Sequence, residues 1–174
     1  MREFTLPLEE KEIASLKAYD RIVLNGSLYV GRDQVHRFLF EMIEKGEDLP
    51  VDLTGATIFY MGPSPAPEGM VIGACGPTTS ARMDPFSPAL LEKGLKVMIG
   101  KGPRSAEVID AIVRTKALYL QAFGGCGALY ANTVKSVKPV AFDHLGPEAM
   151  IELQVEGFAV IVAIDSQGGS VFTR

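Results

Sequence analysis

The stretch that decides the fold is residues 95–116, "LKVMIGKGPRSAEVIDAIVRTK". It contains an apolar run that ends at a glycine, and a turn-rich loop, "GKGPRS", follows that run. Ser105 is a typical helix N-cap, and Glu107 places a negative charge in the first turn, so a helix should begin there. The stretch therefore predicts a strand, a glycine-containing loop and a helix in direct succession.

Two neighbouring stretches repeat this plan, residues 70–94 before it and residues 117–137 after it. Each has a short apolar run, a loop with glycine and a helical segment, and the first strand is expected at 70–73, "MVIG". Strands that alternate with helices favour a parallel sheet. Such sheets bind ligands in the loops at the carboxyl ends of their strands.

The segment before these units combines β-structure with one helix. Residues 21–30, "RIVLNGSLYV", predict a hairpin that turns at Asn25-Gly26. Residues 32–46 predict a helix, because their apolar side chains recur at helical spacing and Gly46 is placed to end it. Residues 56–62, "ATIFYMG", predict a further strand.

The last quarter of the chain returns to β-structure, with strands expected at 138–144, 149–155 and 158–165 and a closing turn at 166–169. No stretch is rich enough in proline, glycine or serine to act as a linker. The expected fold class is therefore α/β, in which strand–Gly loop–helix units are flanked by β-rich segments within a single domain of residues 1–174.

The bulk composition excludes several classes of protein. The 174 residues are 47% hydrophobic and 22% charged, which is typical of a globular chain. A net charge of −4 argues against nucleic acid as a partner, and the chain has no apolar run long enough to span a bilayer. The expected localisation is the cytoplasm, and the two cysteines, far apart in sequence, predict neither a disulfide framework nor a zinc site.

The residues with the clearest chemistry lie in 73–86, "GACGPTTSARMDPF", where Thr78, Thr79 and Ser80 precede Arg82. If a helix begins there, its N-terminal N–H groups and these hydroxyls could bind an anion, with Thr78 and Arg82 on one face. Lys101, with Arg104 after it, lies at the next strand end. These groups indicate a cationic, hydroxyl-lined site for a small dianion.

Two further residues are candidates for that site. Arg32 and His36 are four residues apart in the first predicted helix, so they share a face, which lies off the apolar stripe. Structural roles remain open for every candidate: capping for the hydroxyls, an ion pair with a carboxylate such as Asp84 for Arg82, and a solvated turn for Lys101. Packing or surface roles remain open for His36, His144, Cys75 and Cys126. A non-catalytic anion-binding module and a plain α/β scaffold are therefore alternatives to an enzyme.

Three strings together resemble a known family: "CGPTTSARMD" at 75–84, "GKGPRS" at 100–105 and "AFDHLGPEAMIELQVEGFAVIVAID" at 141–165. They are similar to the β subunit of class I, iron–sulfur-dependent fumarate hydratase and of its relative L-tartrate dehydratase. The likeness begins at "NGSLYVGRDQVH", residues 25–36, and runs almost to the C-terminus. It implies a swivelling β/β/α domain and a hydro-lyase that reversibly hydrates fumarate to L-malate.

The resemblance also implies a role for each matching residue. Thr78 corresponds to the residue that acts as base at the carbon that loses a proton. Arg82 and Arg32 correspond to arginines that hold the substrate carboxylates, and Lys101 to a catalytic lysine that contacts the substrate. The loop "GKGPRS" is nearer to the fumarate enzymes than to the tartrate enzymes, which favours fumarate and keeps tartrate, converted to oxaloacetate, as the alternative substrate.

The same resemblance implies a 4Fe–4S cluster held by three cysteines. This chain has only Cys75 and Cys126, at no recognisable cluster spacing. The cluster is therefore expected on a partner α subunit, and the chain alone should be inactive. The expected assembly is a hetero-oligomer, and pairing of the isolated chain with itself is left open.

Overall fold

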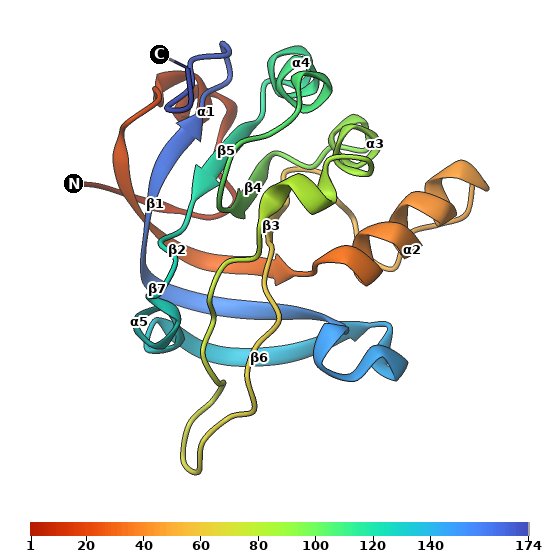
Figure 1. Ribbon diagram of the computed structural model, residues 1–174, viewed down its shortest axis with the longest axis vertical. Coiled ribbons are helices and arrows are strands. Elements are labelled where there is room, and N and C mark those ends of the chain that lie inside the picture. Colours follow the sequence, from red (N-terminus) through yellow and green to blue (C-terminus); the bar gives the residue numbers. More distant parts are fainter. Residues whose placement is uncertain (174) are drawn as a thin grey trace.

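The computed structural model describes residues 1–173 as a mixed α/β protein, with one seven-stranded sheet and several helices (Figure 1). The strands are β1 (Arg2–Thr5), β2 (Arg21–Val30), β3 (Thr57–Phe59), β4 (Val97–Gly100), β5 (Leu118–Gln121), β6 (Val134–Ala141) and β7 (Met150–Ile164). The helices are α1 (Glu10–Ser15), α2 (Asp33–Glu44), α3 (Ser87–Glu92), α4 (Ala106–Thr115) and α5 (Gly127–Ala131), with 3₁₀ turns η1 (Ser80–Met83) and η2 (Asp143–Glu148). None of the helices in this described part is long and apolar enough to cross a membrane.

The first five strands pair in parallel, which agrees with the parallel sheet predicted from the alternation of strands and helices in residues 70–137. β1 to β5 pair in chain order, and every one of these pairings is parallel. β7 runs antiparallel to β5 on one side and to β2 on the other, so the hydrogen bonding closes into a ring of β2, β3, β4, β5 and β7. β6 pairs with the first half of β7, outside this ring.

Side chains alternate between two hydrophobic clusters, as the period of a strand requires. Phe59, Ile99 and Leu120 point into the ring, where they meet the β7 side chains Phe158 and Val162. The neighbouring side chains of β3 to β5 point outward and pack against α2, α3 and α4, which line one side of the sheet in Figure 1. The loops at the carboxyl ends of β2 to β4 therefore extend from a rigid base.

Helix signals read from the sequence are confirmed at both long helices. The Ser105 hydroxyl caps α4 by accepting a hydrogen bond from the Val108 N–H at 3.3 Å. Gly46, at a φ of 68°, ends α2: its N–H donates to the Ile43 carbonyl and the Glu47 N–H donates to the Met42 carbonyl. These two bonds form a Schellman motif, which requires a left-handed residue at the Gly46 position.

The predicted hairpin at Asn25-Gly26 is wrong, because residues 21–30 form one continuous strand. The register between β2 and β7 shifts at Asn25, which faces both Glu156 and Gly157. The Asn25 side chain accepts a hydrogen bond from the Gly157 N–H, and Gly157 has a φ of 78°. Asn25 thus marks a β-bulge between long strands instead of a turn.

Two other strand expectations also require correction. Residues 70–73 form no strand, and Met70 and Val71 are exposed, because this segment belongs to the long loop that projects at the bottom of Figure 1. The first of the three units therefore takes its strand from β3 and its helix from α3. The strands expected at 149–155 and 158–165 are one strand, β7, which continues through the bulge at Gly157.

The end of β7 depends on one buried carboxylate. Asp165 is 4% exposed and accepts hydrogen bonds from the N–H groups of Ala18, Gln167 and Gly169. It therefore organises the closing turn and ties it to the segment before β2.

We expect Asp165→Ala to lower the free energy of unfolding by about 2–3 kcal/mol, because three N–H groups lose a charged acceptor. Urea denaturation of the variant beside Glu156→Ala, at an exposed carboxylate of β7, would measure this. Equal stability of the two variants would show that the turn does not depend on Asp165.

Candidate active site

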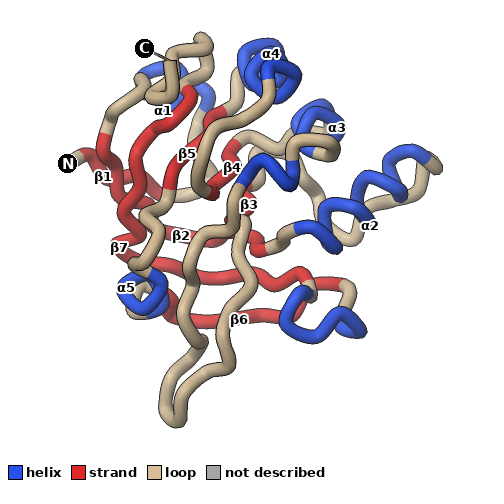
Figure 2. Tube along the Cα trace, in the orientation of Figure 1, coloured by secondary structure: helices blue, strands red, loops and turns tan. Residues whose placement is uncertain are grey.

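The motif residues converge on the carboxyl ends of three adjacent strands, where Figure 2 shows loops leaving the sheet. Arg32 follows β2, and Lys101 follows β4. Between them, Thr78 packs on the residue after β3, since its N–H donates to the Tyr60 carbonyl at 2.7 Å. Thr79 forms a parallel β-bridge with Lys101. Two of the four predicted site residues, Arg32 and Lys101, therefore follow strand ends directly, and the loop 76–82 that holds the other two, Thr78 and Arg82, contacts both the segment after β3 and the segment after β4.

The loop from Thr78 to Ser80 is extended and does not begin an α-helix. The Ser80 N–H donates to the Lys101 carbonyl at 2.9 Å, which continues the bridge at Thr79. Only a 3₁₀ turn, Ser80–Met83, follows. The expectation that Thr78 and Arg82 share one face of a helix, with the helix N-terminus as an anion site, is therefore wrong.

Two glycines lie where the loops approach each other. A Cβ atom at Gly100 would collide with the Ser80 hydroxyl, and one at Gly62 would collide with the Arg32 guanidinium. At Gly100 only glycine leaves room for the short Ser80 side chain, whereas the flexible Arg32 side chain could move away from a Cβ at residue 62. Gly100 therefore lets the Thr78 loop lie directly against β4.

A chain of hydroxyls fixes the backbone at Lys101. The Ser80 hydroxyl accepts from the Lys101 N–H at 3.0 Å and lies 2.8 Å from the Tyr119 hydroxyl, which lies 2.7 Å from the Gly102 carbonyl. The carbonyl can only accept, so Tyr119 gives its single proton to Gly102 and Ser80 gives its own to Tyr119. Burial raises the pKa of Tyr119 above its ordinary value, which keeps this donor protonated.

Arg104, expected in the cationic site, instead lies buried under it. Its guanidinium pairs with Asp84 at 2.6 Å and donates to the Ser87 hydroxyl at 2.8 Å. The rings of Tyr60 and Tyr119 lie against the same guanidinium. Because Asp84 also accepts from the Ser105 N–H, Arg104 joins η1 to the start of α4 and is not available to a ligand.

Both remaining arginines are paired with carboxylates at the rim of the site. Arg32 Nε donates to Glu148 at 2.9 Å, and each of these side chains is 30% exposed. Arg82 pairs with Asp33 through two nitrogens and is about half exposed, so its partner is neither Asp84 nor a helix neighbour. Asp33 follows Arg32 directly, so these pairs bring the two arginines to the first turn of α2.

Thr78 and Lys101 carry the groups that are left free. Within residues 1–173 the Thr78 hydroxyl makes no hydrogen bond and the Lys101 ammonium makes no ion pair. Lys101 is half-buried, and its Nζ lies beside Gly124 in the loop after β5. The arrangement offers one hydroxyl and three cations to a small anion.

His36 does not share an exposed face with Arg32, which corrects the expectation from its spacing. It is fully buried, its Nδ1 lies 2.9 Å from the Arg32 carbonyl, and its ring packs edge-on against Tyr60. Burial lowers the pKa of His36 to about 4, so it is neutral at pH 7. His36 thus holds the start of α2 and does not face a ligand.

The described residues do not fit an iron–sulfur cluster. They contain no group of three or more His, Cys, Asp or Glu side chains placed to hold a metal ion. Cys75 is buried with its thiol directed at the Gly73 carbonyl, and burial raises its pKa to about 11. A thiol that stays protonated at neutral pH is a poor metal ligand.

Several residues that shape the site lie outside the predicted set. Asp33 could have been suspected from its place beside Arg32. Glu148 lies in the string 141–165 that carries the family resemblance, but nothing in that string indicates that it would pair with Arg32. Tyr119 and Ser87 reach the site only through contacts that the fold creates.

The profile of a protein family described as Fumarase C-terminus matches residues 3–174 of the chain. The chain is 39% identical to a relative from Methanocaldococcus jannaschii named as an L(+)-tartrate dehydratase subunit beta, over 95% of this chain and 88% of the relative. It is 36% identical to the aerobic class I fumarate hydratase of Escherichia coli, over 100% of this chain and 31% of that enzyme. It is 36% identical to fumarate hydratase 2 of Leishmania major, over 88% of this chain and 28% of that enzyme. The chain therefore spans most of the first relative and about a third of the fumarate hydratases.

Removing the Tyr119 hydroxyl tests the hydroxyl chain. We expect Tyr119→Phe to lower the free energy of unfolding by about 1–3 kcal/mol, because the Gly102 carbonyl loses its donor. The Lys101 amide should also exchange faster with solvent. Tyr19→Phe, at an exposed tyrosine, is the matched control. Equal free energies of unfolding and equal exchange rates of the Lys101 amide in the two variants would contradict the chain of hydroxyls.

The buried His36 predicts a dependence of stability on pH. Below pH 6.5 the unfolded state binds a proton on this ring that the folded state does not bind until the pH reaches about 4. The unfolding free energy should therefore fall by on the order of 3 kcal/mol as the pH drops through this range. Urea denaturation from pH 7 to 4 should show this loss in the wild-type chain and not in His36→Phe. If the unfolding free energy fell with pH by the same amount in both proteins, folding would not lower the pKa of His36.

Proposed function

The chain belongs to the family described as Fumarase C-terminus, and we propose that it is a subunit of a hydro-lyase that interconverts fumarate and L-malate. The observation that carries the proposal is the convergence of Arg32, Thr78, Arg82 and Lys101 at the carboxyl ends of the neighbouring strands β2 to β4. The relatives named as fumarate hydratase and tartrate dehydratase are hydro-lyases, which supports an enzymatic role.

In the proposed site the cations bind the two carboxylates of the substrate. Arg32 uses only Nε for Glu148, which leaves both terminal nitrogens for a ligand. Arg82 is open to solvent and can exchange Asp33 for a substrate carboxylate. Planar guanidinium groups match a carboxylate with two parallel hydrogen bonds. Binding of the dianion also offsets the local excess of positive charge.

Proton transfer falls to Thr78 and Lys101 in this proposal. Hydration places the hydroxyl of water on one carbon of the double bond and a proton on the other, and dehydration reverses both changes. The Thr78 hydroxyl makes no other hydrogen bond in the described chain, and in dehydration it acts as its alkoxide, after its own proton has been released to solvent. The alkoxide takes the proton from carbon, and the leaving hydroxyl departs as water with the proton released earlier. The ammonium of Lys101, on the residue bridged to Thr79, stabilises the negative charge of the alkoxide and of the deprotonated substrate.

The proposal requires a partner chain. The fumarate hydratases that this chain matches are about three times its length, and the M. jannaschii relative is named as a beta subunit. We assign the 4Fe–4S cluster implied by the family resemblance to an α subunit, because the side chains described here do not fit it. We further propose that residues 1–174 form one domain of the swivelling β/β/α type; the single seven-stranded sheet supports a single domain.

L-Tartrate is the second candidate substrate. The relative named for tartrate has 39% identity and is covered over 88% of its length, more than either fumarate hydratase described above. Tartrate is a dicarboxylate with one more hydroxyl than malate, so the same cations would bind it. Substrate choice therefore depends on groups that meet the extra hydroxyl.

Reconstitution with the α subunit under anaerobic conditions tests the proposal, with fumarate or L-tartrate consumption followed for each chain alone and for the mixture. We expect turnover only in the mixture. Thr78→Ala should reduce kcat by about 100-fold or more, and Arg82→Leu should raise KM by about tenfold or more. Arg21→Leu, at an exposed arginine at the amino end of β2, is the matched control and should change neither value.

Each outcome has a distinct meaning. Unchanged kcat in Thr78→Ala would remove Thr78 as the base, whereas turnover of tartrate alone would transfer the proposal to the second substrate. Failure of both substrates with an intact cluster in the partner would favour a non-catalytic anion-binding module. If Arg82→Leu also bound anions as tightly as the wild type, the remaining interpretation would be a plain α/β scaffold without a binding site.

A further inference from the structure

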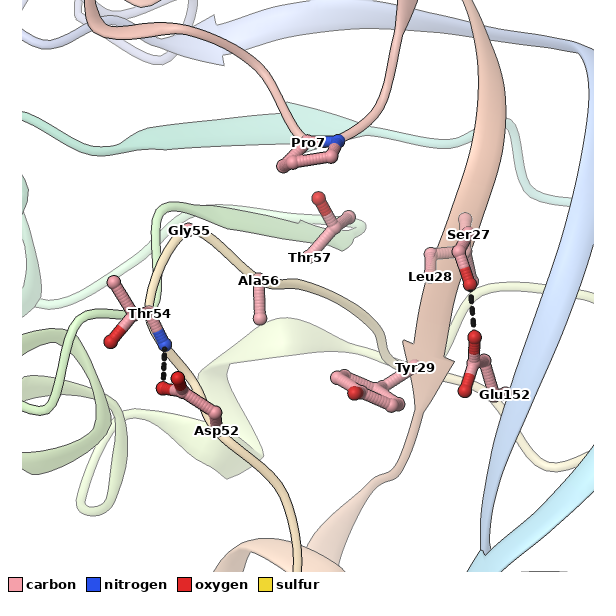
Figure 3. A pocket seen from close by; sticks show the side chains of 10 residues that line it. All are labelled: Pro7, Ser27, Leu28, Tyr29, Asp52, Thr54, Gly55, Ala56, Thr57 and Glu152. Atoms are coloured by element: carbon pink, nitrogen blue, oxygen red, sulfur yellow. Dashed lines mark hydrogen bonds between the residues drawn. The ribbon is translucent and has the colours of Figure 1, made fainter.

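A gap along one edge of β2 contains a second candidate site. β1 pairs with Ile22–Asn25 of this edge and β3 with Tyr29–Val30, so within the described chain neither strand covers Gly26–Leu28. A pocket of about 230 Å³ lies at this gap, between the end of β1 and the start of β3. Figure 3 shows its lining side chains, which include Pro7 above and Glu152 beside β2. The pocket meets β3 at Thr57, whereas the candidate active site follows the other end of that strand.

The lining of this pocket is acidic and rich in hydroxyl groups. It contains the carboxylates Asp52 and Glu152, together with the hydroxyls of Ser27, Tyr29 and Thr57, and no lysine, arginine or histidine. Burial, and then the charges of Glu152 and Asp52, raise the pKa of Tyr29 above its ordinary value. Hydrogen bonds from Thr54 lower the pKa of Asp52, which keeps that carboxylate ionised. The pocket therefore has a negative potential.

One buried polar atom in the pocket has no partner. Thr57 is 3% exposed, and its Oγ1 makes no hydrogen bond in the described chain. Figure 3 shows this oxygen directed toward Pro7, which also lines the pocket. A buried hydroxyl without a partner costs about 1–3 kcal/mol, and a ligand that donates a hydrogen bond to it would recover that cost.

Size and shape restrict the ligand further. The pocket is smaller than the roughly 300–1,000 Å³ of typical drug-sized sites, so it admits a group of side-chain size. Pro7, Leu28 and Ala56 supply apolar surface for a short hydrocarbon stem. A metal ion is a poor fit, because no group of three or more potential ligands occurs among the described residues.

We propose that this pocket binds a small organic cation, a primary ammonium or guanidinium group on a short apolar stem. Glu152 pairs with the cation within the pocket, Asp52 contributes a second charge at its exposed rim, and Thr57 Oγ1 accepts one hydrogen bond. Such a ligand supplies only donors, which matches a lining of carboxylates and hydroxyls. The inference does not rest on the proposed hydro-lyase activity, because it concerns the other end of β3.

An NMR titration of the isolated chain tests this site. Methylguanidinium and n-butylammonium chloride are added at constant ionic strength, with sodium chloride as the reference. We expect saturable amide shifts at Gly55 and Thr57, and Glu152→Gln should weaken the affinity by about tenfold. Glu156→Gln, an exposed carboxylate on the same strand, is the matched control and should bind as the wild type does. Absence of saturable shifts, or equal affinity in Glu152→Gln, would overturn the proposal.

A second variant separates binding from folding. Thr57→Val has nearly the same shape and removes the unpartnered hydroxyl, so it should unfold at the same or a higher temperature and bind the cations at least about threefold more weakly. Lower stability with unchanged affinity would mean that Thr57 has a structural role and would overturn its part in the site. The tripeptide Gly-Arg-Gly distinguishes two sources of the cation: tighter binding than methylguanidinium indicates a side chain of another protein, and weaker binding indicates a free small molecule.

Discussion

The structure depends on the pairing of β7 with both β2 and β5. The four parallel strands β2 to β5 by themselves would have two open edges, at β2 and at β5, and exposed edges leave backbone N–H and C=O groups unpaired. β7 covers the length of β2 and then, beyond the bulge at Gly157, reaches β5 with residues Ile161–Ile164. The resulting ring encloses its own hydrophobic cluster, which includes Phe59 and Phe158. The strand ends that hold the candidate site are therefore fixed relative to one another.

Charge at the candidate site is arranged before any ligand binds. Arg32, which follows β2, and Arg82, in η1, both lie at the first turn of α2 and would repel each other, and the carboxylates of Glu148 and Asp33 reduce that repulsion. Because both pairs remain partly exposed, solvent weakens them, and exchange for a substrate carboxylate costs little. The pair of Arg104 and Asp84 differs in kind, since the Arg104 side chain is fully buried and Asp84 only slightly exposed, and it serves as a support.

The two ends of β3 have opposite potentials. This strand spans only Thr57–Phe59, yet cations gather beyond its carboxyl end and carboxylates surround its amino end. Elements that lie far apart in sequence produce this contrast: Glu152 comes from β7, and Lys101 follows β4. A single short strand thus separates the proposed dianion site from the proposed cation pocket.

The sequence by itself determined the elements whose signals are local. Helices α2 and α4 were predicted from apolar spacing together with Gly46 and Ser105, because caps and periodicity act within a few residues. The placement of the candidate site residues at the carboxyl ends of neighbouring strands was also predicted, because consecutive parallel strands direct their carboxyl ends the same way.

Only the tertiary structure decided which polar residues face a ligand. His36 and Arg104 carried the same sequence signals as Arg32 and Lys101, but contacts with Tyr60, Asp84 and Ser87 bury them. Asn25 was predicted to form a turn and instead marks a bulge, because β7 supplies a partner from more than a hundred residues away. Burial and long-range strand pairing are properties of the assembled chain, and no pattern within a few residues encodes them.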